Sequence, residues 1–440
     1  MSKIKIPQKA ALMVAGLFLA ISTAATGDPM PSALDRAAED YVKLALGIGR
    51  YDPIYIDAYY GPPEWKPEPA AKEERFPARA LRRRANTLLE VLNRLPAHRF
   101  SELEQQRRLF LQKQVTAALG RIDMLDGKKM SFDQESRLLY DAVAPRRADT
   151  DHEKITAQLE RLLPGTEFLG HRVETFQKKF TIPADRLADV FAAAIAECRR
   201  RTNEHIQLPP GENFQTEFVS GQPWGAYNWY KGNLFSLIQI NTDFPLALAS
   251  AIGLAGHEGY PGHHVYNLLL ETRLLKSRNW IEFSVYPLYS PQSLIAEGTA
   301  NYGLELLFPG TEKLDFERRV LYPLAGLDAV DSEKYHRVRT LVHELGVAST
   351  EISRDYLDGV ISHEEALRRT RQVELNSLPH AEATLRFAET YRSYIINYTL
   401  GEKLIREFIT RKCPDPADIN ARWQLFERLL SEPWIPSMLK

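Results

Sequence analysis

The sequence has little cysteine and no surplus of charge of either sign. Its 440 residues contain two cysteines, Cys198 and Cys413, which lie far apart and form no CxxC pair. This excludes a cysteine-based metal site and a dense disulfide framework. One disulfide between them stays open, although two unpaired buried thiols are the interpretation we favour. With 56 Lys and Arg against 57 Asp and Glu, the net charge of −1 also excludes a nucleic-acid binder that works by bulk positive charge.

The apolar run near the N-terminus, Ala10–Ile21, is too short to span a membrane comfortably. Three lysines precede it and small residues follow it, which is the order of a secretory signal peptide. We therefore predict a cleavable signal peptide at 1–25. An uncleaved anchor is the alternative. Cleavage changes the net charge to −4, because it removes three lysines and no acidic residue. No cysteine follows the run, so we expect a periplasmic or extracellular protein with no stable membrane anchor.

Beyond residue 30 the pattern is mainly that of helices. Apolar residues recur at helical spacing over 32–49, 78–125 and 131–208, and the charges between them are typical of solvated faces. The segment 51–65 carries four tyrosines, a tryptophan and a helix-stopping Gly-Pro-Pro. We interpret it as a loop that either forms an aromatic rim towards a substrate or packs on the helical body.

One region departs from the helical pattern. Residues 209–243 are poor in helix formers and rich in turn signals, which predicts two or three short strands, the clearest at Leu234–Ile240. The most apolar helical stretch, 244–273, follows directly. The predicted fold is thus mainly α, a large helical body with a small β-sheet before this stretch. We divide it into an N-terminal helical region, 26–208, and a second region, 209–440, without a sharp boundary.

The chemistry is concentrated in the apolar stretch, at HEGYPGHH. Three of the chain's 11 histidines, His257, His263 and His264, fall within eight positions, and Glu258 follows the first. A zinc-protease helix needs two imidazoles on one side and a carboxylate beside the first, and HExxH supplies them at i, i+1 and i+4. Here position i+4 is Pro261, so the spacing departs from that motif.

Helix geometry shows what this departure requires. On a straight helix His263 would point about 120° away from His257, and His264 would share its face roughly 10 Å further along. Pro261, however, clashes with the carbonyl of His257, and Gly262 follows it. The helix should therefore bulge. If Pro261 and Gly262 loop out, His263 takes the place of the second ligand, with His264 as the alternative ligand or a supporting partner.

A catalytic zinc site takes three protein ligands and keeps one position open. The third ligand should come from the next amphipathic helix, at 291–308, where Glu297 is the early carboxylate. Gly298 lets a neighbouring backbone come close. Glu305, eight residues after Glu297, lies within about 80° of the same side. We regard it as the candidate to brace a ligating histidine.

HEGYPGHH followed by AEGTANYGLE resembles the bacterial domain-of-unknown-function 885 (DUF885) family, whose pattern is HExxPGHH and then EGxAxYxE. The resemblance covers residues 250–310 firmly, with Thr299 in place of the usual Trp. It implies a zincin-like, gluzincin-type metallopeptidase that holds one Zn2+ ion. By matching positions, the metal ligands would be His257, His263 and Glu297, and the general base would be Glu258.

The C-terminal third should supply a donor for the developing oxyanion. The stretch around Tyr398–Gly401 resembles a late Tyr-x-x-Gly element of the family, which makes Tyr398 the candidate donor. His343 and Arg392 are weaker candidates.

Three functions follow as hypotheses. The first is an exported zinc peptidase that cleaves peptide bonds with Glu258 as base and holds an extended peptide along Leu234–Ile240 by β-augmentation. The second keeps the zinc but acts on a non-peptide or cell-wall amide. The third is a non-catalytic metal-binding envelope protein. The motif is evidence against this hypothesis, because closed structural zinc sites usually have four protein ligands and the motif offers three.

Overall fold

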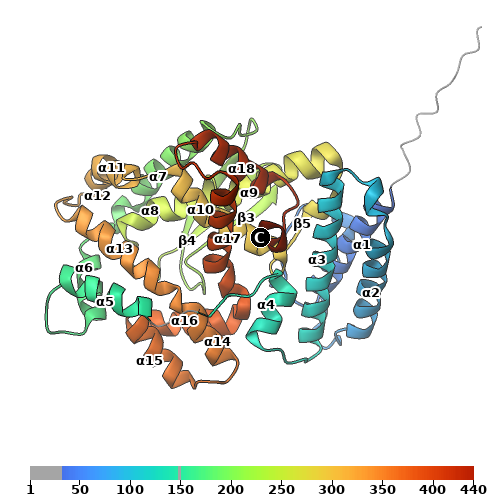
Figure 1. Ribbon diagram of the computed structural model, residues 1–440, viewed down its shortest axis with the longest axis horizontal. Helices are drawn as coiled ribbons and strands as arrows, with labels where there is room; N and C mark the ends of the chain where they lie inside the picture. Colours follow the sequence, from blue (N-terminus) through green and yellow to red (C-terminus); the bar gives the residue numbers. More distant parts are fainter. Residues whose placement is uncertain (1–31, 147–149) are drawn as a thin grey trace, which may run out of the picture.

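The computed structural model describes residues 32–146 and 150–440, and in this part of the chain it is mainly helical with two small β-sheets (Figure 1). The predicted fold class is confirmed. The predicted signal peptide lies outside the described residues, and the division near residue 208 stays a prediction. None of the described helices is long and apolar enough to cross a membrane. Cys198 and Cys413 are both free and buried, as we favoured.

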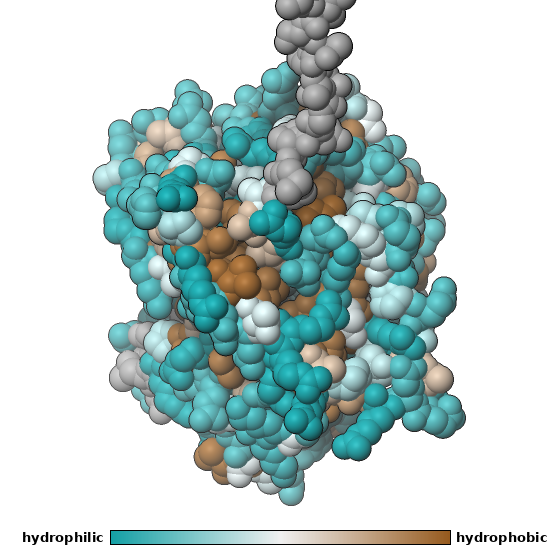
Figure 2. Space-filling model, turned by 90° about the vertical axis from the view of Figure 1, so that its right-hand side faces the viewer, coloured by the Kyte–Doolittle hydropathy of each residue, from teal (hydrophilic) through white to brown (hydrophobic). Residues whose placement is uncertain are grey.

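The first N-terminal helix lies in the segment 32–49, which the apolar spacing predicts to be helical, and a capping residue precedes it. α1 (Ala33–Gly49) begins after Ser32, whose hydroxyl accepts a hydrogen bond from the backbone N–H of Asp35, while the Asp35 carboxylate accepts one from the backbone of Ser32. α2 (Ala78–Arg94) and α3 (Glu102–Leu125) pack beside it. Figure 2 shows the face on which these helices lie: hydrophilic side chains cover most of it, and hydrophobic residues gather in a hollow near its middle.

The other helices build the rest of the body around one extended hydrophobic core, to which residues from both ends of the described chain contribute, and a second small cluster of Ile352, Ala366 and Leu385. They are α4 (Phe132–Tyr140), α5 (Thr150–Leu162), α6 (Leu169–Lys178), α7 (Leu187–Asn203), α11 (Glu312–Phe316), α12 (Tyr322–Ala325), α13 (Ser332–Gly346), α14 (Ala348–Leu357), α15 (His363–Val373), α16 (Leu378–Tyr391) and α18 (Ile419–Ser431).

The segment 51–65 is not all loop. Its centre forms β1 (Ile56–Tyr59), which pairs antiparallel with β5 (Val285–Pro287) from the other half of the chain. The pairing is irregular between Ile56 and Ala58. A strand of four residues whose partner lies more than 200 positions away leaves little local signal, which explains the error. The pairing carries the segment towards the centre of the molecule.

The predicted small sheet is present and contains β2 (Asn213–Val219), β3 (Ala226–Gly232) and β4 (Phe235–Asn241) in the order β2-β4-β3. β4 runs parallel to β2 and antiparallel to β3. The strand predicted at Leu234–Ile240 is therefore β4, one residue displaced, and it is the central strand. Because both of its edges are already paired, our expectation that it holds a peptide by β-augmentation is wrong.

The apolar helical stretch breaks at the Pro-Gly pair, as predicted. α8 (Leu248–Leu254) continues into a π-helical turn, Ala255–Gly259, and the chain resumes as α9 (His263–Leu269), followed by a second π-helical segment, Leu270–Lys276. The Tyr260–Pro261 peptide bond is cis. Gly262 is required in this break, since a Cβ at this position would lie 1.9 Å from the carbonyl oxygen of His257.

The helix predicted at 291–308 is α10 (Pro291–Leu307), which packs along α17 (Ile396–Lys412). The two helices touch backbone to backbone at Gly298 and Gly401. A Cβ on Gly298 would lie 2.5 Å from the carbonyl carbon of Gly401. The expected role of Gly298 in a close backbone approach is confirmed.

Candidate metal centre

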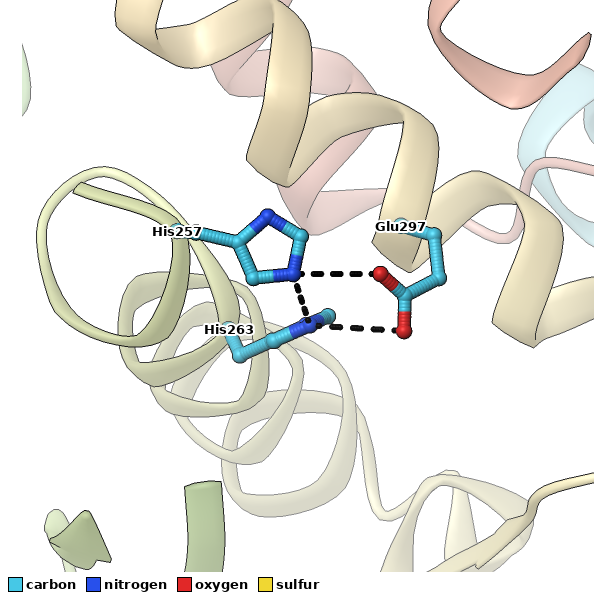
Figure 3. Close-up of side chains that lie close together, drawn as sticks. All are labelled: His257, His263 and Glu297. Carbon is cyan, nitrogen blue, oxygen red and sulfur yellow. Dashed lines mark hydrogen bonds and ion pairs between the residues drawn. The ribbon is translucent and has the colours of Figure 1, made fainter. Parts of the chain in front are cut away.

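Three side chains from the broken helix and from α10 converge in the interior. His257 lies in the π-helical turn, His263 begins α9, and Glu297 projects from α10 towards both (Figure 3). The side chains are 13%, 12% and 6% exposed, respectively. The break after residue 259 is what turns His263 towards His257, because an unbroken helix would direct the two imidazoles apart.

The potential ligand atoms of the three residues lie within 4.8 Å of one another. Nε2 of His257 is 3.1 Å from Oε2 of Glu297, and Nε2 of His263 is 3.6 Å from Oε1. The two Nε2 atoms face each other at 3.2 Å. Two imidazole nitrogens and one carboxylate form a set of donor atoms suited to a metal ion.

The hydrogen bonds around His257 fix its tautomer. The Asn301 side chain donates through Nδ2 to the backbone oxygen of Tyr398 at 3.1 Å, so its Oδ1 faces Nδ1 of His257 at 3.0 Å as an acceptor. Nδ1 of His257 must then carry the proton, which leaves the lone pair of Nε2 directed at His263 and Glu297. This is the arrangement in which a histidine binds a metal.

The two carboxylate oxygens of Glu297 differ in their hydrogen bonding. Oε1 accepts a hydrogen bond from the Tyr394 hydroxyl at 2.7 Å. Oε2 is buried, and the group facing it is Nε2 of His257 at 3.1 Å, which in the neutral tautomer set by Asn301 has a lone pair and no proton to donate. A buried carboxylate oxygen without a donor is costly, and a cation held between Glu297 and the two histidines would satisfy it. The residues therefore fit a metal ion.

The charges of this group are strongly coupled. Without a bound cation, burial disfavours protonation of His257, but Glu297 and Glu258 outweigh it and raise the pKa of His257 to about 9, so a metal ion at Nε2 would take the place of the second ring proton. Burial likewise opposes the ionisation of Glu297, yet the two histidines hold its pKa well below the ordinary value. Glu258 is 5% exposed, and its burial raises its pKa. Glu258 is thus the carboxyl of the group that most readily holds a proton.

The group opens onto a pocket of about 580 Å³. Aromatic rings dominate its wall, and they come from the sheet, from β5 and from the C-terminal helices: Trp224, Tyr227, Tyr286, Phe387, Tyr391, Tyr394 and Tyr398. Glu258 and Asp57 also line it, whereas its described lining contains no lysine or arginine. The pocket is therefore aromatic and acidic.

Of the further predicted residues, only Tyr398 lines this pocket, where its ring lies 6.4 Å from that of His257. His343 is 76% exposed and 3.9 Å from Glu402, and Arg392 pairs with Glu135 at 2.7 Å. Both are absent from the pocket lining, so neither of these weaker candidates lies where an oxyanion donor is needed. Helical periodicity could not show which face of α13 or which turn after α16 packs inward.

Glu305 does not brace a histidine either. It is exposed and pairs with Arg406 at 2.6 Å, whereas the brace is Asn301, which lies one turn after Glu297. Asn301 is about 40° from the direction of Glu297, closer than Glu305. A carboxylate was expected to brace the histidine, but the residue in this role is the amide of Asn301.

His264, the alternative ligand, turns away from the group. Its Nε2 lies 3.0 Å from Oε2 of Glu212, and its Nδ1 lies 2.8 Å from the hydroxyl of Ser236. Both ring nitrogens are therefore occupied at a position with 0% exposure. His263, as preferred, is the histidine that meets His257 and Glu297.

Asp57 is a pocket residue that the sequence analysis missed. It lies in β1, and its Oδ1 accepts a hydrogen bond from the Tyr227 hydroxyl. Burial raises its pKa to about 6, against the opposing influence of Tyr227 and His263. Nothing in the sequence near residue 57 marks it, because only the β1–β5 pairing brings it here.

No protein-family model and no curated protein sequence matches the chain. Among solved structures, it is similar to a predicted lipoprotein from Colwellia psychrerythraea, with 14% identity and a TM-score of 0.51 over 82% of this chain and 68% of that one. It is also similar to a predicted lipoprotein of unknown function from Shewanella oneidensis, with 13% identity and a TM-score of 0.48 over 82% and 71%. At these identities the likeness concerns the fold alone, and DUF885 membership stays a prediction.

Proposed function

We propose that this protein is an exported zinc-dependent metallopeptidase of the DUF885 type. The observation that carries the proposal is the convergence of His257, His263 and Glu297 beside the buried carboxyl of Glu258, at the wall of one pocket. Catalytic zinc sites take three N and O ligands of this kind, whereas structural sites usually close with four and often use cysteine. The group has three members among the described residues, which favours catalysis over a purely structural role.

Zinc bound there would supply a Lewis acid that activates water and polarises the substrate carbonyl. Glu258 accepts the proton of the attacking water and passes it to the leaving amine. Burial raises the pKa of this carboxyl, so it holds the proton more readily between the two transfers. Asn228 donates a hydrogen bond to the backbone oxygen of Glu258 at 2.6 Å and so fixes the backbone at the base.

Tyr398 is the proposed donor to the oxygen that becomes negative. Burial raises the pKa of its hydroxyl well above the ordinary value, so it keeps its proton at neutral pH and can donate. Tyr394, its neighbour in the pocket, already donates to Glu297. The two tyrosines therefore have separate roles, one towards the substrate and one towards a metal ligand.

A peptide is the substrate we favour, because the pocket offers aromatic walls and the motif resembles those of metallopeptidases. A non-peptide or cell-wall amide is the alternative, since the same reaction applies to any amide. The exported location rests on the predicted signal peptide. The likeness to predicted lipoproteins agrees with an envelope location, although no cysteine follows the apolar run here.

The deciding variant is Glu258→Gln, which removes the base and keeps the side-chain size. We expect it to retain one equivalent of zinc by elemental analysis and to lose hydrolysis of a peptide library by about 10²–10⁴-fold. A variant that hydrolyses as fast as the wild type would exclude Glu258 as the base. Hydrolysis of a peptidoglycan digest but of no peptide would favour the cell-wall alternative. Protein without zinc, and without activity restored by zinc, would exclude both enzymes.

A further inference from the structure

Two asparagines of the pocket present oxygen atoms that lack a hydrogen-bond donor. Asn228 in β3 is 6% exposed and Asn267 in α9 is 3% exposed. Both line the pocket. The side-chain oxygen of each is buried, and no group in the described protein donates to it. Among the buried side-chain atoms without a partner, these two acceptors belong to residues that line the same pocket as the metal centre, so a ligand in the pocket could supply their donors.

The orientation of each amide follows from its other end. Nδ2 of Asn228 donates to the backbone oxygen of Glu258 at 2.6 Å, and Nδ2 of Asn267 donates to the backbone oxygen of His263 at 3.0 Å. Turning either amide round would bring two oxygens together. Both Oδ1 atoms must therefore remain acceptors, and neither residue can gain a donor by turning its amide.

Asp57 adds a negative charge to the same pocket. The Tyr227 hydroxyl donates to one of its oxygens, and the described lining offers it no lysine or arginine. The carboxylates of Glu258 and Glu297 face the pocket as well. Away from the metal ion, a bound anion such as the carboxylate end of a peptide would meet these carboxylates and no lysine or arginine of the described lining.

An ammonium group has the complementary properties. It carries one positive charge and three N–H donors, and it accepts no hydrogen bond. The carboxylate of Asp57 would neutralise its charge, the two amide oxygens could receive its donors, and the surrounding aromatic rings favour a cation over water.

We propose that Asp57, Asn228 and Asn267 form a subsite for a substrate ammonium group, so that the enzyme selects amides that carry a free amine near the reacting bond. The inference rests on the proposed function and specifies its substrate class. The amine is either the amino terminus of a peptide or a lysine side chain, and the experiment below separates these two sources.

The first experiment is a binding measurement that needs no hydrolysis. Isothermal titration calorimetry on the zinc-loaded protein would compare phenylalaninamide with N-acetylphenylalaninamide and with N-acetyllysinamide. We expect phenylalaninamide to bind at least tenfold more tightly than its acetylated form. Tight binding of N-acetyllysinamide would assign the amine to a lysine side chain instead. Equal affinity for the free and acetylated phenylalanine compounds would overturn the subsite.

The variant Asp57→Asn tests the charge while keeping the size and the hydrogen bond from Tyr227. We expect it to retain zinc and to reduce the preference for the free amine to near unity, mainly through KM where hydrolysis is measured. Asp185→Asn, at an exposed aspartate with a side chain 77% exposed, is the matched control and should keep the preference. If Asp57→Asn keeps it too, Asp57 is not the recognising group.

The two failures can be told apart. A protein that binds zinc and prefers the free amine but hydrolyses no amide contradicts the proposed function and leaves the subsite standing. A protein that hydrolyses free and N-acetylated peptides at equal kcat/KM contradicts the subsite and leaves the peptidase standing.

Discussion

His263 and His264 are adjacent in the sequence, and each meets a buried glutamate, yet their surroundings differ. His264 contacts Glu212 and Ser236, and both of its ring nitrogens have partners. His263 faces His257 and Glu297, where two nitrogen atoms point at each other and a carboxylate oxygen lacks a donor. The first cluster is complete within the protein, whereas the second has room for a cation.

The pKa values of Glu212 and His264 agree with a cluster whose hydrogen bonds are all satisfied within the protein. Burial opposes ionisation of Glu212, but hydrogen bonds from His264, Tyr260 and Arg199 outweigh it and lower its pKa to about 2. Burial lowers the pKa of His264, which stays neutral. A carboxylate can only accept, so Nε2 of His264 donates to Glu212 and Nδ1 accepts from Ser236. The complete cluster thus anchors the start of α9, and the incomplete one is available for chemistry.

The largest expected difference is between the variants His263→Ala and His264→Ala. His263→Ala should abolish stoichiometric zinc binding and all zinc-dependent hydrolysis, with a small change in the stability of the metal-free protein. His264→Ala should retain zinc and lose about 1.5–3 kcal/mol of stability, because Glu212 keeps Arg199 and Tyr260 as donors but loses one buried hydrogen bond to its carboxylate. Elemental analysis and urea unfolding would measure both. Zinc loss in His264→Ala with retention in His263→Ala would reverse the assignment.

Glu212→Gln should lower the free energy of unfolding by about 3 kcal/mol at pH 7, the magnitude that corresponds to its lowered pKa. A carboxyl with a depressed pKa stabilises the folded state above its unfolded pKa, near 4.5, and loses this contribution as the pH falls through about 2. The difference between wild type and variant should therefore shrink from pH 5 downwards. A difference that does not depend on pH would show that packing, and not charge, is responsible.

The smallest effect is expected at Asn301, which accepts a hydrogen bond from His257 in the cluster of His257, His263 and Glu297. Asn301→Ala removes the acceptor that sets the tautomer of His257, and we expect zinc affinity to fall about 10–100-fold in competition with a chelator. Glu305→Gln, on the same helix but exposed and paired with Arg406, is the control and should bind zinc as the wild type does. Equal losses in the two variants would indicate a general disturbance of α10.

The sequence predicted those features of the fold that depend only on neighbouring residues. The helix at 32–49, the strands around 213–241 and the break at Pro261 follow from the residues at those positions, and the break identified His263. What escaped prediction depends on packing between distant segments. Asp57 reaches the pocket through a pairing with 285–287, and Glu305 is drawn outward by Arg406 from another helix. No periodicity within one segment contains this information.

At Gly298 and Gly401 no side chain separates α10 from α17, so the two backbones are in direct contact. α10 carries Glu297 and Asn301, and α17 carries Tyr398, so the distance between a metal ligand and the proposed oxyanion donor depends on how closely these helices approach. One added methyl group at either glycine would push α17 away from α10, which would move Tyr398 and also loosen the hydrogen bond that Asn301 makes to the Tyr398 backbone oxygen. Reaction rate and metal affinity should therefore both fall with the smallest substitution that a glycine allows.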